Sequence, residues 1–182
     1  AEAVTRENVA FVSIKTIEQI SIQSTHRIRS FYVRQRTALM NMVRGLLLEH
    51  GVAIKKSESA LIKKLNELLD IENSCLDEEN KSNFQNLYDD LKNLDSRIDQ
   101  QTTKLRSLAK QDELCQRLQT IEGIGAITAT ALIAKIGNGC DFKNGRELSA
   151  YLGLVPKQHS SGDTQRLLSI TKHGDRYIRV LL

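Results

Sequence analysis

Residues 77–110 carry a heptad repeat, and this repeat constrains the fold more than any other feature of the chain. Apolar side chains fill the two seam positions in successive heptads, with one glutamine as the exception. Such a pattern predicts a long helix with a single apolar stripe, as in a coiled coil. The first seam positions are Phe84, Leu91, Ile98 and Leu105, and the second are Leu87, Leu94, Gln101 and Leu108.

The apolar stripe has to be buried, either in an antiparallel hairpin within the chain or in a dimer between chains, and the sequence leaves both open. Gln101 either fixes the register of the seam or is simply tolerated there. A partner helix is expected at residues 17–49, because Thr16 is typical of a helix start and Gly51 of a helix stop. Its expected seam consists of Ile28, Tyr32, Gln35, Leu39, Met42 and Leu46.

Shorter elements complete the expected fold. A helix capped by Ser57 is predicted over residues 57–70, another over 145–152, and a last one near the C-terminus. Residues 9–15 are apolar and β-branched, which suggests a short strand or an extended lead-in. Because the chain has one proline, no tryptophan and only 4% aromatic residues, its composition also favours helices.

We therefore expect an all-α fold, in which a long helical coiled-coil region precedes a small C-terminal domain. The composition changes near residue 112, after which glycines become frequent. The expected bounds are 1–16 for a linker or the end of an N-terminal domain, 17–112 for the coiled-coil region and 113–182 for the C-terminal domain.

Charge is distributed unevenly along a chain whose net charge is +4. Two basic regions, 26–46 and 143–179, flank an acidic stretch at 67–99. The first contains no acidic residue, and its bases are Arg27, Arg29, Arg34, Arg36 and Arg44. This pattern fits contact with a polyanion such as nucleic acid, and it also fits ordinary solvated helix faces.

Cysteine usage and hydropathy bear on the compartment. Cys75, Cys115 and Cys140 are odd in number and lack metal-ligand spacing, which argues against a disulfide framework or a metal site. The chain shows neither a signal peptide nor an apolar run long enough to span a membrane. We therefore expect a cytoplasmic protein without membrane contact.

A glycine-rich turn follows residue 120. The segment Ile121-Glu122-Gly123-Ile124-Gly125 precedes an alanine-rich stretch, and this order is typical of a helix-hairpin-helix motif. Its glycines would permit a tight turn and leave the backbone N–H groups of the next helix open to a phosphate. The expected nucleic-acid contacts here are Gly123, Gly125, Ala126 and Thr128. The alternative is a plain helical hairpin with a glycine-containing turn.

The second candidate site is a serine-rich loop after Pro156. His159, Ser160, Ser161 and Gly162 follow one another there. A serine hydroxyl is a weak nucleophile unless a base or positive charge assists it. Either His159 or His173 could carry a proton, although both could equally be surface residues, and the segment could be only a loop. The cations that could surround a phosphoryl group are Lys157, Arg166, Lys172, Arg176 and Arg179, with Arg27 and Arg34 as further nucleic-acid contacts.

Taken in order, these segments resemble one family, the DEDD-type bacterial insertion-sequence transposases of the IS110/IS1111 group. The resemblance is carried by TIEGIGAITATALIAKIG, DFKNGRELSAYLGLVPKQHSSG and ITKHGDRYIRVLL in residues 117–182. It extends through HRIRSFYVRQRTALMNMVRGLLLEHG to the first residues and is weakest over 55–110.

The resemblance implies a DNA transposase that binds DNA and uses a structured guide RNA to choose target and donor DNA. It also implies that Ser161 attacks a DNA phosphodiester, with Ser160 as the competing candidate, and that the coiled coil assembles subunits. Members hold Mg²⁺ on an acidic set in an N-terminal RuvC-like domain. Residues 1–50 resemble the stretch that joins the family's two domains, and the acidic motifs lie upstream of it. We therefore expect no metal site in this chain and no activity without the remainder of the protein.

Two other functions remain open at this stage. One is a non-enzymatic helix-hairpin-helix module that binds DNA and oligomerises. The other is a purely structural coiled-coil adaptor, which would show no salt-dependent DNA binding, whereas phosphate contacts weaken steeply as salt rises.

Overall fold

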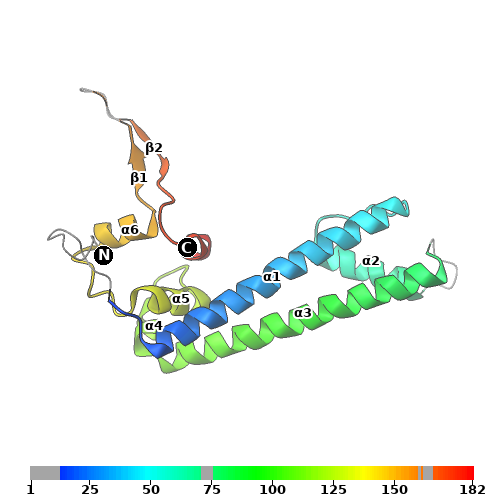
Figure 1. The fold of residues 1–182 in the computed structure, drawn as a ribbon, viewed down its shortest axis with the longest axis horizontal. Coiled ribbons are helices and arrows are strands. Elements are labelled where there is room, and N and C mark those ends of the chain that lie inside the picture. The colour runs from blue at the N-terminus through cyan, green and yellow to red at the C-terminus, as the bar shows by residue number, and fades with distance from the viewer. Residues whose placement is uncertain (1–12, 71–75, 160, 162–165) are drawn as a thin grey trace, which may run out of the picture. The chain divides into compact units, whose positions relative to one another are not determined.

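The computed structural model describes residues 13–70, 76–159, 161 and 166–182. In chain order the elements are α1 (Ile17–Glu49), α2 (Glu58–Asp70), α3 (Glu78–Gln111), α4 (Glu113–Leu118), α5 (Ala126–Ile136), α6 (Gly145–Leu152), β1 (Pro156–Gln158), β2 (Leu167–Ile170) and α7 (Arg176–Leu181), as Figure 1 shows. The expected fold, mostly helical with a long helix, is confirmed.

The chain divides into two compact units, and the first is the helical unit, residues 25–104. In it α1 and α3 run antiparallel, and α2 lies beside them near one end (Figure 1). The predicted helices over 17–49, 57–70 and 77–110 are confirmed to within about one residue at each end. One apolar core joins the three helices, and its buried members include Val43, Leu47, Leu61, Leu65, Phe84 and Leu91.

The heptad repeat of α3 predicted its buried face correctly. Phe84, Leu91, Ile98 and Leu105 are all buried, and Leu94 is buried beside them. The polar Gln101 is only half-buried. Side chains spaced by three and four residues lie on one helix face, which is why the repeat identifies that face without further information.

The predicted seam of α1 was only partly right, because Tyr32 and Leu39 are half-buried and Leu39 packs against the core. Ile28, Met42 and Leu46 are exposed. The buried positions of α1 lie instead on another face of the helix, at His26, Met40, Val43 and Leu47.

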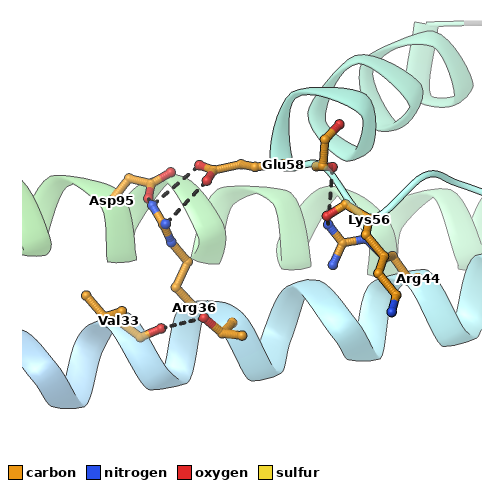
Figure 2. Close-up of polar contacts among 8 residues, drawn as sticks. Val33, Arg36, Arg44, Lys56, Glu58 and Asp95 are labelled. Carbon is orange, nitrogen blue, oxygen red and sulfur yellow. Dashed lines mark hydrogen bonds and ion pairs between the residues drawn. The ribbon is translucent and has the colours of Figure 1, made fainter. Parts of the chain in front are cut away.

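Arginines explain the error, because the true seam continues through Arg29 and Arg36, which pattern analysis assigns to the surface. Arg36 donates from Nη1 to Oδ1 of Asp95 on α3 at 2.7 Å and lies 3.3 Å from Oε2 of Glu58 on α2 (Figure 2). The hydrogen bond to Asp95 holds the pKa of Arg36 above its ordinary value, although partial burial opposes the shift. Arg29 donates from Nε to the hydroxyl of Thr102 at 2.8 Å.

Arg44 ties α1 to the start of α2 in a similar way. Its Nη2 donates to the carbonyl oxygens of Lys56 and Ser57 at 3.0 and 3.2 Å, and Figure 2 shows Arg44 beside Lys56. The carbonyls precede α2, where Ser57 accepts from the N–H of Ala60 as the helix cap. Three of the arginines in the basic region therefore serve the fold.

His26 gives the helical unit a dependence on pH. Its side chain is only 3% exposed, and burial, with a further contribution from the charge of Arg29, lowers its pKa from 6.5 to about 4. Between these values the unfolded chain binds the proton and the folded chain does not. The contribution of His26 to stability is therefore complete above pH 6.5 and is lost as the pH falls toward 4.

We expect His26→Gln to reduce this acid sensitivity. The lowered pKa of His26 corresponds to a loss on the order of 3 kcal/mol in the free energy of unfolding across the window. Urea unfolding at pH 7 and near pH 4.5 measures it in the parent, in His26→Gln and in a control, His173→Gln, at an exposed position. Equal acid sensitivity in the parent and His26→Gln would contradict the account.

The second compact unit is the C-terminal unit, residues up to 24 together with 105–182. The helix α5 forms its centre, because most of its residues are buried. One side packs with Cys115 and Ala109, and the other with Leu152 and Ile178. Of the apolar stretch expected to be extended at 9–15, only 13–15 lies within the described residues, where it has no regular structure.

The strands β1 and β2 form an antiparallel hairpin where the sequence suggested only a loop. Pro156 pairs with Ile170 and Gln158 with Leu167, with an irregular register between them. The N–H of His159 donates to the carbonyl of Arg166 at 2.9 Å and extends the pairing. Every residue of both strands is exposed. The hairpin therefore lacks the apolar face by which sequence patterns reveal strands.

Hydropathy along the helices bears on membrane insertion. Over the described part of the chain, none of the helices combines the length and the apolar character that crossing a bilayer requires.

Candidate nucleic-acid interface

The glycine turn joins α4 to α5 in the C-terminal unit. After α4, the N–H groups of Thr120 and Ile121 donate to the carbonyls of Arg117 and Leu118 at 3.2 Å each. Gly123 then adopts a φ of 87°, in the left-handed region that favours glycine. The turn is therefore built from its own backbone and depends on a glycine at position 123.

Gly125 is the N-cap of α5 and leaves the start of that helix open. Its backbone is extended, and no side chain caps the helix. The first N–H groups of a helix have no partner inside it, so those of Ala126 and Ile127 face outward along the helix axis. A Cβ added at Gly125 would meet nothing within 4 Å. The helix start therefore offers backbone donors beside open space.

Ala126 and Thr128, the other predicted contacts at this site, lie more deeply. Ala126 is half-buried against the core that contains Ala129. Thr128 is buried, and its hydroxyl donates to the carbonyl of Leu181 at 3.3 Å. A phosphate at this helix start would therefore meet main-chain groups and not the Thr128 side chain.

Two glycines that sequence reasoning did not single out hold α6 against the loop before α7. A Cβ on Gly174 would overlap the backbone of Tyr151 and Leu152, and one on Gly153 would lie 2.7 Å from the N atom of Gly174. The N–H of Lys172 donates to the carbonyl of Gly153 at 3.1 Å. The signal for Gly153 was its place directly after a predicted helix.

The start of α7 is fixed by Asp175, another residue that sequence reasoning left unassigned. Its carboxylate accepts from the N–H of Tyr177 at 2.9 Å and lies 3.4 Å from Nζ of Lys135 on α5. Burial alone would raise the pKa of Asp175, but the hydrogen bond from Tyr177 and the charge of Lys135 hold it below its ordinary value. The carboxylate therefore anchors α7 to α5.

The predicted cations of the C-terminal unit fall into two groups. Arg179 is half-buried and donates from Nη1 to the carbonyl of Leu152 at 3.1 Å, which ties α7 to α6. The other four are exposed: Lys157 on β1, Arg166 just before β2, Lys172 after it and Arg176 at the first position of α7.

Lys172 has the only positive φ among the described residues other than glycine, at 61°. This conformation costs a residue with a side chain on the order of 1 kcal/mol. The hydrogen bond from the N–H of Lys172 to the carbonyl of Gly153 helps to hold this strained conformation in the loop between β2 and α7.

Ser161 lies in the segment that joins β1 to β2, and it is exposed. His159 and His173 are also exposed. Ser160 and Gly162 lie outside the described residues. Arg27 and Arg34, the remaining predicted contacts, are exposed on α1 in the helical unit.

Potential metal ligands and the Cys115 thiol are further chemical groups in the described part of the chain. No group of three or more His, Cys, Asp and Glu side chains among those residues could hold a metal ion. Burial, with a contribution from Asp112, raises the pKa of the Cys115 thiol to about 11. That thiol is therefore protonated at neutral pH and a poor nucleophile.

Comparison with known proteins places the chain among bacterial transposases. The model of the transposase IS116/IS110/IS902 family matches residues 115–182, which contain the glycine turn, the hairpin and Ser161. Over these residues the chain is similar to this family of transposases.

Relatives extend the similarity to the whole chain. A probable family 20 transposase of Pseudomonas aeruginosa is 41% identical over 182 residues, which are 100% of this chain and 54% of the relative. The transposase for insertion sequence element IS1111A of Coxiella burnetii is 40% identical over all of this chain and 50% of its own length. The chain thus spans about half the length of these relatives.

A third relative matches only part of the chain. The pilin gene-inverting protein of Moraxella bovis is 38% identical over 66 residues, which are 36% of this chain and 20% of the relative. Its name describes inversion of a gene, whereas the names of the longer matches describe transposition.

Proposed function

We propose that the chain binds DNA and supplies the serine nucleophile for strand exchange by an insertion-sequence transposase. The observation that carries the proposal is the exposure of Ser161 on a hairpin whose neighbouring exposed cations include Lys157 and Arg166. Both transposition and gene inversion, the processes named for the relatives, require DNA strands to be cut and rejoined.

DNA would be gripped through its phosphates by the turn between α4 and α5, in the manner of a helix-hairpin-helix motif. The uncapped N-terminus of α5 presents the N–H groups of Ala126 and Ile127, and the helix dipole there favours an anion. Gly123 and Gly125 carry no side chain that would block the approach. Such contacts position the backbone and carry little information about base sequence.

The proposed chemical step joins Ser161 to the DNA. The hydroxyl of Ser161 loses its proton to a base, with His159 and His173 as candidates, and its oxygen bonds to the phosphorus of a phosphodiester. The bond from that phosphorus to one sugar oxygen breaks, and the sugar oxygen takes up a proton as it leaves. The energy of the phosphodiester is conserved in the phosphoserine bond, so another DNA hydroxyl can displace the serine and rejoin the strands.

Exposed cations would stabilise the negative charge that develops on the phosphoryl oxygens. Arg166 and Lys157 lie on the hairpin that carries Ser161, and Lys172 and Arg176 follow it in the sequence. Arg179 is engaged with the carbonyl of Leu152 and would act by positioning α7.

The complete reaction is proposed for the whole protein. The relatives are about twice as long as this chain. Mg²⁺, bound by acidic residues outside this chain, would assist the chemistry of the full-length enzyme. A structured guide RNA would choose the DNA, and self-association through α1 and α3 would assemble the subunits.

Gly125→Val tests the phosphate grip without disturbing the fold. The backbone at Gly125 suits any residue, and the new side chain would enter open space where the phosphate is expected. We expect duplex DNA affinity to fall about tenfold, which corresponds to the loss of charge-assisted backbone contacts. Fluorescence anisotropy with a labelled duplex measures the affinity, and circular dichroism checks the fold.

The control for this substitution is Gly145→Val, at the first position of α6, where a Cβ would also meet nothing within 4 Å and where no DNA contact is proposed. Equal duplex affinity in the parent and Gly125→Val would remove the helix start from the interface. DNA affinity that does not change with salt concentration would favour a structural adaptor instead.

A further inference from the structure

The five arginines of residues 26–46 separate into two groups in the helical unit. Arg29, Arg36 and Arg44 bond to α3 or to the start of α2 and hold the helices together. Arg27 and Arg34 are exposed on the opposite side of α1. Maintenance of the fold therefore accounts for the first group, whereas the second group has no part in it.

Arg27 and Arg34 keep their charge available. The segment 26–46 contains no acidic residue, so neither arginine has an acidic neighbour one helical turn away within it. Among the residues that the structure describes, no carboxylate forms an ion pair with either guanidinium. The Arg34 side chain donates from Nε to the carbonyl of Ser30, at 3.4 Å.

Phe31 lies between the two arginines on the same face of α1. Its position, four residues after Arg27 and three before Arg34, places all three side chains in one row. The rise from Arg27 to Arg34 is about 10 Å. Phe31 is 47% exposed, which is unusual for a phenylalanine in a folded domain.

The ring of Phe31 packs against the neighbouring ring of Tyr32. Its centroid lies 5.8 Å from that of Tyr32, with an angle of 54° between the rings. The guanidinium carbon of Arg97 on α3 lies 5.7 Å from the centroid of Tyr32 on the ring's face. Phe31 is therefore an exposed aromatic ring that contacts the Tyr32 ring. Exposed arginines, Arg27 and Arg34, lie on either side of it along the helix.

We propose that Arg27, Phe31 and Arg34 form a binding site for single-stranded DNA. The ring of Phe31 stacks on one unpaired base, and the two guanidinium groups contact phosphates on either side of it. Stacking on aromatic rings combined with phosphate contacts is how proteins bind single strands without reading sequence. The inference rests on the proposed function, since strand exchange separates the duplex and exposes unpaired bases.

Other occupants fit this face less well. Paired bases are covered by their neighbours in a duplex, so Phe31 would have no base to stack on. A second copy of the chain docked antiparallel through the same face would bring Arg27 of one chain toward Arg34 of the other, and this like-charge contact would be unfavourable. A single strand of DNA offers phosphates to the two arginines and an unpaired base on which the Phe31 ring can stack.

Tryptophan fluorescence tests the stacking directly. The chain has no tryptophan, so Phe31→Trp introduces a single tryptophan, whose emission can be excited selectively, at the proposed site. We expect an oligo-dT strand of about 15 nucleotides to quench its emission. The matched control is Leu48→Trp, at a position on α1 that is 62% exposed and outside the site. Equal quenching in both variants, or none in Phe31→Trp, would overturn the proposal.

Affinity measurements test each part of the site. Phe31→Ala should weaken binding of the same strand about tenfold, whereas Leu48→Ala should leave it unchanged. Replacing both Arg27 and Arg34 by alanine should reduce the slope of log affinity against log salt by about 1.4, the value for two phosphate contacts on a single strand. The charge-matched control replaces Lys55 and Lys56, which are exposed in the same unit.

The outcomes separate this inference from the proposed function. If the parent binds duplex but Phe31→Ala does not weaken single-strand binding, this inference fails and the proposed function stands. If the parent binds neither form, the proposed function fails as well. Tighter binding of an RNA strand of the same length would overturn the assignment to DNA. A change in the mass of the particle in solution on Phe31→Ala, with unchanged affinity, would show a contact between copies instead.

Discussion

Replacing Ser161 by alanine in the full-length transposase is expected to abolish strand exchange and to leave DNA binding intact. Without the hydroxyl no phosphoserine bond can form, and loss of a catalytic nucleophile lowers the rate by about 10⁴-fold or more. The exposed position of Ser161 means that its side chain supports no core, so the variant should fold normally. A recombination assay with donor and target DNA measures the rate, and a gel-shift titration measures binding.

Ser160→Ala is the matched control, because it removes the neighbouring hydroxyl and keeps Ser161. It should retain strand exchange. Loss of activity in Ser160→Ala with normal activity in Ser161→Ala would move the nucleophile by one residue. Full activity in both variants would favour the alternative, a DNA-binding module in which no serine reacts.

The largest expected effect on stability comes from Gly174→Ala. The new Cβ would overlap the backbone of Tyr151 and Leu152, and neither segment can move away easily because the N–H of Lys172 is bonded to Gly153. We expect a loss of about 3 kcal/mol or more in the free energy of unfolding of the C-terminal unit. Urea unfolding followed by circular dichroism measures the change.

Gly145→Ala provides the comparison for Gly174→Ala. It makes the same chemical change at the first position of α6, where a Cβ would meet nothing within 4 Å. Its effect should stay within about 0.5 kcal/mol, or be slightly stabilising, because alanine favours helix. A Gly174→Ala protein as stable as Gly145→Ala would show that α6 and the loop before α7 are not packed as closely as described.

The sequence was a good guide wherever burial alone decides a position. In α3 the buried seam is apolar at Phe84, Leu91 and Ile98, so periodicity identifies it directly. In α1 the apolar residues at the expected seam were misleading. The seam that the fold uses contains Arg29 and Arg36, whose partners are far away in the sequence, so no local pattern could reveal it.

The hairpin of β1 and β2 illustrates a second limit. Its strands bury nothing, so they lack the alternation of apolar and polar residues that predicts a strand. Backbone pairing such as that between Pro156 and Ile170 holds it together, and backbone groups are the same for every residue type.

The candidate site was found in part from local motifs. The glycine turn and the exposed serine were both visible in the sequence, because glycines at 123 and 125 and the Ser-Gly step are local signals. The close packing of Gly153 with Gly174 and the anchoring of Asp175 by Lys135 were missed, since each joins segments distant in sequence. Burial of Thr128 likewise follows from its contact with the end of α7 and from nothing in the turn itself.

The central claim is that the oxygen of Ser161 becomes bonded to DNA phosphorus. The most direct measurement stops the full-length transposase during reaction with nicked DNA, digests protein and DNA, and locates the attached nucleotide by mass spectrometry. The account predicts a nucleotide on Ser161 and none in the Ser161→Ala protein. A nucleotide attached to another residue, or strand exchange that proceeds with no protein–DNA bond at all, would contradict it.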